Sequence, residues 1–290
     1  MGKQGGRRLN VSGVLRQLGV SRSGYNSWKN RIPSSREQRK NQIKNKICDI
    51  YEESHHNYGA PKITKKLQEE GESISEKTVG NYMREMGLKP QWVKPYTITT
   101  IDPDFSEDYK NILDEQFNPD APDQIWCSDI TYIWTCEGFV YLTSIMDLYS
   151  RKIISWVLSD TLETKWLVEA VKKAQETRKA SRPLIMHSDR GRQYTSKEYA
   201  DAAWGITLSY SKKAYPWDNA CIESFHALLK REWINRFKIT DYKHAYKLIF
   251  EYIEAFYNTV RIHSHCDYTS PNDHEKNYWI TLRHLEIGAA

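Results

Sequence analysis

The chain has 290 residues and a mass of 34.1 kDa, enough for one large domain or several small ones. Only 39% of its residues are hydrophobic, the mean hydropathy is −0.73, and no apolar run is long enough to cross a membrane. The basic N-terminus lacks the apolar stretch of a secretory signal. Five scattered cysteines without a C-x-x-C pair argue against a disulfide framework or a structural zinc site. We therefore expect a globular protein of the cytoplasm.

Charge is distributed unevenly along the chain. Residues 1–100 carry 19 Lys and Arg against 9 Asp and Glu, a balance of +10, whereas residues 101–290 have a balance of −5. A basic region joined to a mildly acidic one favours a polyanion-binding part and a part with another task. On charge alone, the ordinary uneven surface of a helical protein is an equally good interpretation.

A first helix-turn-helix unit is expected within residues 1–32. Gly19 suits the left-handed turn position, and Ser21 is a candidate N-cap for the helix that follows. Tyr25 and Trp28 lie three positions apart, as the buried face of that helix would require. A helix, a glycine turn and a capped helix together form the helix-turn-helix pattern.

A second unit of the same kind is expected within residues 58–98, after a connecting helix over residues 33–57 with an isoleucine stripe. Gly71 is its expected turn and Ser75 the expected N-cap of its second helix. The exposed face of that helix would carry three polar residues, Lys77, Asn81 and Arg84. Two such units in a region of charge +10 indicate nucleic-acid binding.

The pattern changes after this basic region. Residues 99–124 hold eight acidic residues, three prolines and one lysine, which predicts a linker laid over a surface rather than packed. Residues 125–265 are expected to form an α/β domain, a mixed five-stranded sheet flanked by helices with strands one, four and five parallel, and residues 266–290 a C-terminal tail. The expected strands are 124–134, 139–146, 152–158, 183–187 and 206–210, and the expected helices 165–178, 196–204, 218–236 and 241–260.

Three acidic residues of this domain are placed where the architecture would bring them together. Asp129 lies inside the first strand, where a charge is costly unless it is paired or bound to a metal. Asp189 follows the fourth strand, so parallel pairing would set the two carboxylates side by side. Glu223 lies on a later helix that can point back at them. Three carboxylates are hard oxygen ligands suited to Mg²⁺ or Mn²⁺.

Each of these acids also has a plainer interpretation. Asp129 could pair with a lysine or arginine, Asp189 could form the turn before Gly191, and Glu223 could be a solvated helix residue with Glu232 in its place. Other polar residues are expected to be structural: Asp147 fixing a turn, Asp218 capping its helix, His187 packed in its strand, and His55, His56, His263 and His265.

Three segments together resemble the signature blocks of bacterial insertion-sequence transposases of the DDE type. They are residues 126–132 (WCSDITY), 187–194 (HSDRGRQY) and 218–225 (DNACIESF). The resemblance is in particular to the second-reading-frame product of the IS-three family, and it covers nearly the whole chain. It implies the ribonuclease-H-like fold shared with retroviral integrases. Because the family's upstream-frame segment has no match, we expect either the product of one frame or part of a frameshift fusion.

The resemblance implies an enzyme of DNA recombination and integration. It would cleave transposon ends in a metal-dependent reaction and transfer the freed 3′-hydroxyl, joining end to end through a circular intermediate. Two Mg²⁺ (or Mn²⁺) ions would be held by Asp129, Asp189 and Glu223, with Asp129 bridging. The implied partners are double-stranded DNA, as terminal inverted repeats and as target, and at least a second copy of the chain, in a nucleoid-associated complex.

Candidate DNA contacts and two alternative functions complete the prediction. Lys230 matches a basic residue that the family carries seven positions after its glutamate, and it would share a helix face with Glu223. Asp189 and Glu223 are 34 positions apart, slightly fewer than in the family, so a shorter helix is expected before Gly205. The alternatives are a DNA-binding regulator with a vestigial active site and a ribonuclease-H-like nuclease that does not join. The other expected DNA contacts are Arg22, Lys77, Arg84 and Asn219, the last also a possible helix cap.

Overall fold

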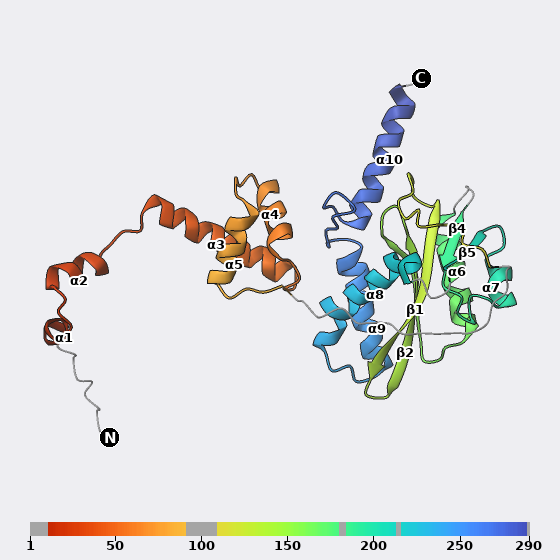
Figure 1. The fold of residues 1–290 in the computed structure, drawn as a ribbon, viewed down its shortest axis with the longest axis horizontal. Coiled ribbons are helices and arrows are strands. Elements are labelled where there is room, and N and C mark those ends of the chain that lie inside the picture. The colour runs from red at the N-terminus through yellow and green to blue at the C-terminus, as the bar shows by residue number, and fades with distance from the viewer. Residues whose placement is uncertain (1–10, 91–108, 180–183, 213–215, 289–290) are drawn as a thin grey trace.

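The computed structural model describes residues 11–90, 109–179, 184–212 and 216–288. Helices occupy the N-terminal part of this chain, a mixed sheet with helices on both sides forms the core, and a last helix ends it (Figure 1). Residues 1–10 of the expected first unit, 91–98 of the second and 99–108 of the linker lie outside the described residues. None of the helices within the described ranges is long and apolar enough to span a membrane.

The first helix-turn-helix unit consists of α1 (Val11–Gln17) and α2 (Arg22–Lys29). Gly19 has the expected positive φ of 67°, and the Ser21 hydroxyl accepts a hydrogen bond from the Gly24 amide at 3.0 Å, as an N-cap does. The prediction that Trp28 is buried is wrong, because its side chain is 72% exposed and α2 buries no residue. Helices of seven and eight residues supply too little apolar surface to cover an indole.

The second unit consists of α4 (Ala60–Glu69) and α5 (Glu76–Glu85), which form a compact three-helix cluster with the connecting helix α3 (Ser35–Glu53). Gly71 has a φ of 86°, and the Ser75 hydroxyl accepts from the Thr78 amide at 3.3 Å, so the turn and the cap are confirmed. Burial of the isoleucine stripe on α3 against the other two helices holds the cluster together. Its buried side chains include Ile43, Ile47, Ile63, Leu67 and Val79.

The second unit also contacts the core. Ile262 of the core packs in the apolar cluster of the three helices, and its amide donates to the Tyr58 hydroxyl at 3.0 Å. Arg236 donates to the His55 carbonyl and to Asn57 Oδ1. Polar and apolar contacts therefore fix this unit against the α/β core.

The described part of the acidic linker, residues 109–124, follows the core closely. The amides of Ile112 and Leu113 donate to the Ser209 hydroxyl at 2.9 and 3.0 Å. Leu113 is 2% exposed and belongs to the core's apolar cluster. This half of the linker is therefore packed, contrary to the prediction from composition, because one leucine among the acids reaches a pocket between the elements of the core.

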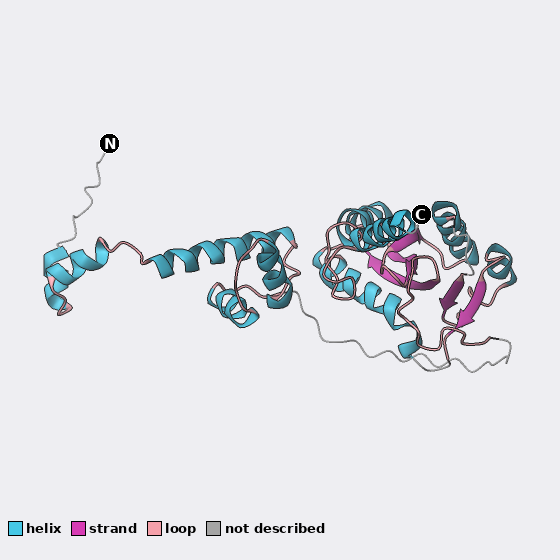
Figure 2. Ribbon diagram, turned by 90° about the horizontal axis from the view of Figure 1, so that it is seen from above, coloured by secondary structure: helices cyan, strands magenta, loops and turns pink. Residues whose placement is uncertain are grey.

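The core sheet has five strands in the order β3-β2-β1-β4-β5. β1 pairs antiparallel with β2 and parallel with β4, and β5 is parallel to β4, which confirms the predicted ribonuclease-H-like α/β sheet (Figure 2). Gly138, with a φ of 126°, forms the tight turn between the first two strands. The strands are β1 (Ile125–Thr135), β2 (Gly138–Asp147), β3 (Ile153–Ser159), β4 (Ile185–Ser188) and β5 (Thr207–Tyr210).

Helices cover both faces of this sheet because each central strand buries side chains on both sides. Trp126 of β1 packs on the face of α6 (Thr164–Arg178) and the short α7 (Lys197–Ala202). Cys127 packs on the opposite face, where α8 (Ala220–Glu232) and α9 (Tyr242–Phe250) lie. The single helices expected over 218–236 and 241–260 are each divided. The first consists of η1 (Pro216–Asn219), α8 and η2 (Ile234–Arg236). The second consists of α9 and the π-helix η3 (Glu251–Tyr257).

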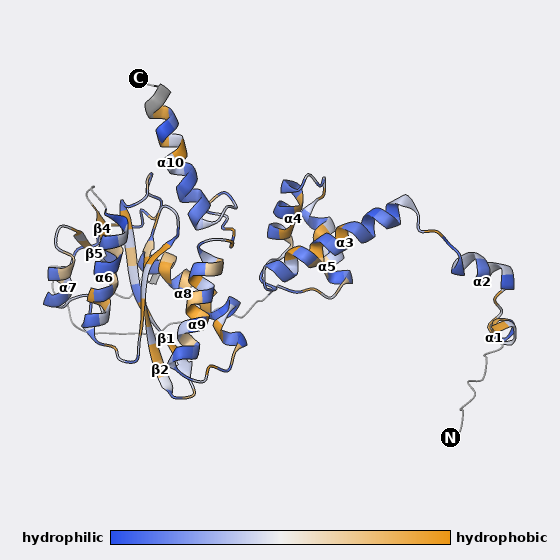
Figure 3. Ribbon diagram, turned by 180° about the vertical axis from the view of Figure 1, so that it is seen from behind, coloured by the Kyte–Doolittle hydropathy of each residue, from blue (hydrophilic) through white to orange (hydrophobic). Residues whose placement is uncertain are grey.

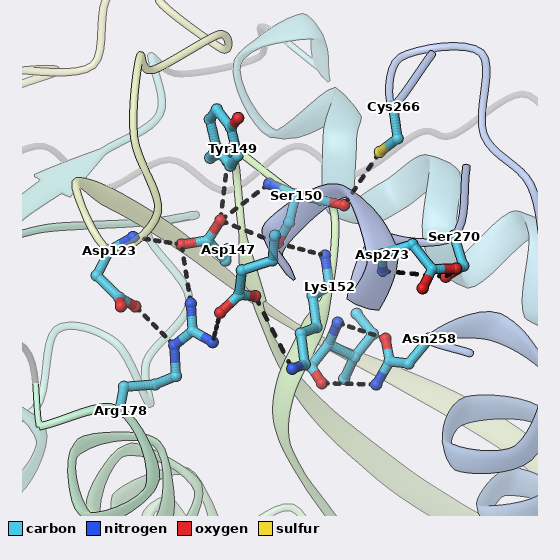
Figure 4. A network of polar contacts seen from close by, with 12 residues as sticks. Asp123, Asp147, Tyr149, Ser150, Lys152, Arg178, Asn258, Cys266, Ser270 and Asp273 are labelled. Carbon is cyan, nitrogen blue, oxygen red and sulfur yellow. Dashed lines mark hydrogen bonds and ion pairs between the residues drawn. The ribbon is translucent and has the colours of Figure 1, made fainter. Parts of the chain in front are cut away.

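The expected C-terminal tail contains a helix, α10 (Pro271–Gly288), that extends away from the sheet (Figure 1). A buried polar network fixes its first turns to the core (Figure 4). Arg178 Nε donates to Asp123 Oδ1 at 2.7 Å, its NH1 donates to Glu275 of α10, and its NH2 lies 3.8 Å from Asp147 Oδ2. We call these four residues the Arg178 cluster. Asp147 also accepts from the Ser150 amide at 3.0 Å, which confirms its predicted role in the turn.

Candidate active site

Two of the three predicted acids are brought together by parallel strand pairing. β1 and β4 pair through Cys127 and His187, and Asp129 and Asp189 each follow two positions later. Asp189 comes directly after the last residue of β4, so its carboxylate lies at the strand end instead of within the ladder. The Gly191 amide donates to Asp189 Oδ1 at 2.9 Å and thereby orients that carboxylate.

Glu223 reaches the same site from the first turn of α8. Burial, together with the charges of Asp129 and Asp189, raises the pKa of Glu223 to about 7. Burial and the charge of Asp129 raise the pKa of Asp189 to about 6, although the Gly191 hydrogen bond opposes this. Three carboxylates from distant segments are thus close enough to interact electrostatically, and their role as metal ligands stays a prediction. We call them the acidic trio.

The chemistry of the acidic trio fits a divalent cation. Besides burial, the charges that raise the pKa of Asp189 and of Glu223 are those of other carboxylates, which a bound cation would offset. All three donors are hard carboxylate oxygens, which suit Mg²⁺ or Mn²⁺. Within the described ranges, no three such side chains already stand as a complete metal cage.

A small cavity of ≈ 150 Å³ adjoins the two aspartates. Asp129 and Asp189 line one part of it and the aromatic rings of Tyr132 and Tyr141 another. A larger cavity of ≈ 830 Å³ lies beside it and shares Leu162 and Gln193 in its lining. The acids are therefore accessible from a hollow in the surface instead of being sealed in the core.

His226 is a residue of the site that the sequence analysis did not single out. Its Nδ1 lies 3.2 Å from Asp129 Oδ2, and its Nε2 lies 3.2 Å from the Ser144 hydroxyl of β2. The imidazole is 5% exposed and so holds Asp129 from the side opposite to solvent. Its position three residues after Glu223 places both on one face of α8, and this spacing was the available signal.

Lys230 also lies at the site, as its spacing from Glu223 predicts. Its ammonium lies 4.7 Å from the centre of the Tyr132 ring. Burial lowers the pKa of Lys230, while the nearby Asp129 charge works in the opposite direction. The lysine is therefore placed between the acidic trio and an aromatic surface.

The other predicted DNA contacts are separate from the acidic trio. Arg22 on α2 and Lys77 and Arg84 on α5 are exposed. Asn219 holds the N-cap position of α8 without a side-chain capping bond and is only 5% exposed, so capping by its side chain is not observed. Contact of any of these four residues with DNA stays a prediction.

The competing interpretations of nearby residues are also resolved. Glu232 accepts from Arg261 at 2.6 Å and from the Tyr252 hydroxyl at 2.9 Å, a buried arrangement that occupies both of its oxygens. Asp218 does not cap α8 as expected, because its Oδ2 accepts from the Lys212 amide and from Asn111. His187 is fully buried, and its Nδ1 lies 2.9 Å from the Ser209 hydroxyl, as expected for a packed strand residue.

Comparison with known proteins gives consistent matches over most of the chain. Residues 119–216 and 204–271 match family models of an integrase core domain, and residues 38–96 match an HTH-like domain. The transposase for insertion sequence element IS904 of Lactococcus lactis is 37% identical over 248 residues, covering 85% of this chain and 98% of that protein. Transposase InsF for insertion sequence IS3A of Escherichia coli is 33% identical, covering 92% and 94%.

Solved structures with a similar core include an integrase. The HTLV-2 integrase catalytic core domain in complex with magnesium, in its trimeric form, aligns with a TM-score of 0.43 at 14% identity. The alignment covers 55% of this chain and 99% of the integrase domain.

Proposed function

Because the chain belongs to the IS-three (IS3) family of insertion-sequence transposases, we propose that its acidic trio cleaves transposon ends and transfers the freed 3′-hydroxyl to another phosphodiester. The chain carries the integrase core of a DDE-type polynucleotidyl transferase. One observation supports the assignment of Asp129, Asp189 and Glu223 above the others: burial and the charges of neighbouring carboxylates from separate segments raise the pKa of both Asp189 and Glu223.

A pair of Mg²⁺ or Mn²⁺ ions, when bound, would polarise the phosphodiester and neutralise the charge that develops on the leaving oxygen. Asp129, Asp189 and Glu223 are the residues that would hold these ions. The Gly191 amide holds the Asp189 carboxylate, and α8 directs Glu223 toward the pair. The bonds to Gly191 and His226 orient two of the three carboxylates before DNA arrives.

DNA recognition is assigned to the N-terminal units and to Lys230. Arg22, Lys77 and Arg84 are cations on exposed helix faces, so they are available to phosphates of the terminal inverted repeats. Lys230 would contact a phosphate next to the reacting one. Joining of one transposon end to the other, which would give a circular intermediate, needs two ends at once, so we propose at least a dimer as the active complex.

The test is cleavage and joining of labelled linear DNA that carries the element's terminal repeat, with Mg²⁺ and then with EDTA. We expect metal-dependent joined product that is lost in Glu223→Gln. Glu176→Gln, on the exposed face of α6, is the matched control and keeps full activity. A substrate with two ends on one molecule would give a circular product if end-to-end joining is correct.

Other outcomes would distinguish the alternative functions. Cleavage without joining, even from a pre-nicked end with a free 3′-hydroxyl, would indicate a nuclease. Tight binding with neither step would indicate a DNA-binding regulator.

A further inference from the structure

The end of the β1–β2 hairpin carries exposed aromatic side chains. Tyr132, Trp134 and Phe139 are 55%, 63% and 47% exposed. Large aromatic side chains are normally buried in the core of a folded protein. Three exposed ones in one place form an apolar patch, which indicates a binding surface. We call these three residues the aromatic face. Hydrophobic residues are visible along both strands in Figure 3.

The aromatic face is an ordered surface. Trp134 and Phe139 are directly opposite each other in the β1–β2 register, and their ring centres lie 4.7 Å apart in an edge-to-face contact. The Tyr132 and Phe139 rings make a second edge-to-face contact at 5.4 Å. Two paired strands hold all three rings, so the face is rigid before any ligand binds.

The aromatic face meets the acidic trio at one cavity. Tyr132 is three residues beyond Asp129 on the same strand, roughly 10 Å by the rise of a strand, so the two side chains leave opposite faces of β1. Both residues line the cavity of ≈ 150 Å³. β4 pairs with β1 through Ile125, Trp126 and Cys127, so β1 has no parallel partner beside the aromatic face. A polymer engaged at the acids would therefore meet the rings next.

The charges nearby decide which part of a nucleic acid suits this surface. Lys230 lies over the Tyr132 ring at the end nearest the acids, where it could meet a phosphate. Glu137 is exposed at the tip of the hairpin and would repel one. Flat apolar rings between these two residues bind the faces of bases, and a base in a duplex has no free face.

We infer that the aromatic face binds unpaired bases of the DNA strand next to the phosphodiester that reacts. This rests on the proposed function, because the position of the DNA is set by the acidic trio. Stacking on the rings would stabilise an opened duplex end, and this opening would let the strand reach the recessed carboxylates. The ligand class is thus single-stranded or frayed DNA, recognised without regard to sequence.

The first experiment compares Trp134→Ala with wild type on terminal-repeat DNA whose flanking base pairs are either matched or mismatched. We expect joining on matched ends to fall roughly tenfold, the typical effect of losing one stacked base, and most of the loss to be recovered on mismatched ends. Trp134→Phe keeps a ring and should keep most of the activity. Trp204→Ala removes a tryptophan that is 87% exposed elsewhere and should change nothing.

The second experiment is independent of joining. DNA with 5-iodouracil at the bases that flank the reacting phosphate is bound to Asp129→Asn, irradiated, and the cross-linked peptide identified. We expect cross-links to residues 132–139, and none when Trp134→Ala and Tyr132→Ala are added.

The outcomes separate this inference from the proposed function. If wild type joins ends but Trp134→Ala matches it and no cross-link maps to the hairpin, the inference is wrong and the transposase assignment stands. If cross-links map to the hairpin but wild type never joins, the inference stands and the assignment fails. Equal loss on both substrates with a changed sedimentation coefficient would overturn the inference in favour of a contact between two copies.

Discussion

Two groups of three carboxylates lie on the same α/β core and differ in how their charge is balanced. In the Arg178 cluster, Asp123, Asp147 and Glu275 surround one buried guanidinium (Figure 4). In the acidic trio, the charges of the carboxylates raise the pKa values of Asp189 and Glu223 further than burial alone, and a histidine contacts Asp129. Carboxylates that surround a buried guanidinium form a structural contact. Carboxylates that repel one another without such a cation are instead available to bind a ligand cation.

The largest expected effect comes from removing one acid of the trio. Asp129→Asn should lower joining roughly a thousandfold, because metal assistance to phosphoryl transfer contributes several kcal/mol and each 1.36 kcal/mol is tenfold. DNA affinity, measured by filter binding, should remain nearly unchanged. A parallel loss of affinity would show that Asp129 supports binding and is not purely catalytic.

Breaking the Arg178 cluster should affect stability instead of chemistry. Arg178→Met removes the cation from three acids that are largely buried, at a cost of about 3–5 kcal/mol in the free energy of unfolding. Urea denaturation measures the loss. Arg178→Lys keeps a charge without the forked geometry of the guanidinium, so its free energy of unfolding should lie between those of wild type and Arg178→Met. A loss below about 1 kcal/mol would mean that α10 is held by other contacts.

The contact of His226 with Asp129 predicts an intermediate effect. His226→Ala should lower joining roughly 10–100-fold, the usual range for a residue that orients a metal ligand. The loss should appear as a higher Mg²⁺ requirement, whereas a general packing defect would lower activity equally at all Mg²⁺ concentrations. His226→Gln, which retains hydrogen-bonding atoms, should recover part of the activity.

Burial of Glu223, together with repulsion within the trio, predicts a pH effect on stability without metal. The pKa of Glu223 is raised from 4.5 to about 7 in the folded state, so the folded protein binds more protons than the unfolded chain between these values. In EDTA, stability should therefore fall as pH rises from about 4.5 through 7. Glu223→Gln should reduce this fall and raise the melting temperature above that of wild type at pH 8. An identical pH profile in the two proteins would contradict the repulsion.

The smallest effect is expected for single DNA contacts on α5. Lys77→Ala and Arg84→Ala should each reduce the slope of log affinity against log salt by roughly one unit. Lys243→Ala, an exposed lysine on α9, is the control. A variant with an unchanged slope removes that residue from the set of phosphate contacts.

The sequence predicted the acidic trio because each of the three acids can be recognised from its immediate neighbours in the chain. A charge inside a core strand, a second after a parallel strand and a third on a following helix can each be recognised in a short segment. Pairing of neighbouring parallel strands then brings the first two together without further information. The same reasoning predicted that strands one, four and five run parallel, and it predicted the two glycine turns at Gly19 and Gly71.

Features that depend on distant partners were not predicted. His226 gains its role from Asp129 and Ser144, which lie 97 and 82 positions away. The sequence predicts only a tail where α10 lies, because the contact that fixes this helix to the core, between Glu275 and Arg178, joins residues 97 positions apart. Trp28 shows the converse: its spacing on α2 resembles a buried face, but within the described part of the chain it is 72% exposed. Residue spacing predicts which side chains share a face of a helix or strand, whereas the residues that contact this face are known only from the fold.

The most direct test of the contrast between the two carboxylate groups is Mn²⁺ binding followed by electron paramagnetic resonance, with terminal-repeat DNA present. We expect binding to wild type that is lost in Glu223→Gln and unchanged in Glu275→Gln, whose carboxylate already faces Arg178. Equal Mn²⁺ binding in wild type and Glu223→Gln would contradict the assignment of the acidic trio as the metal site.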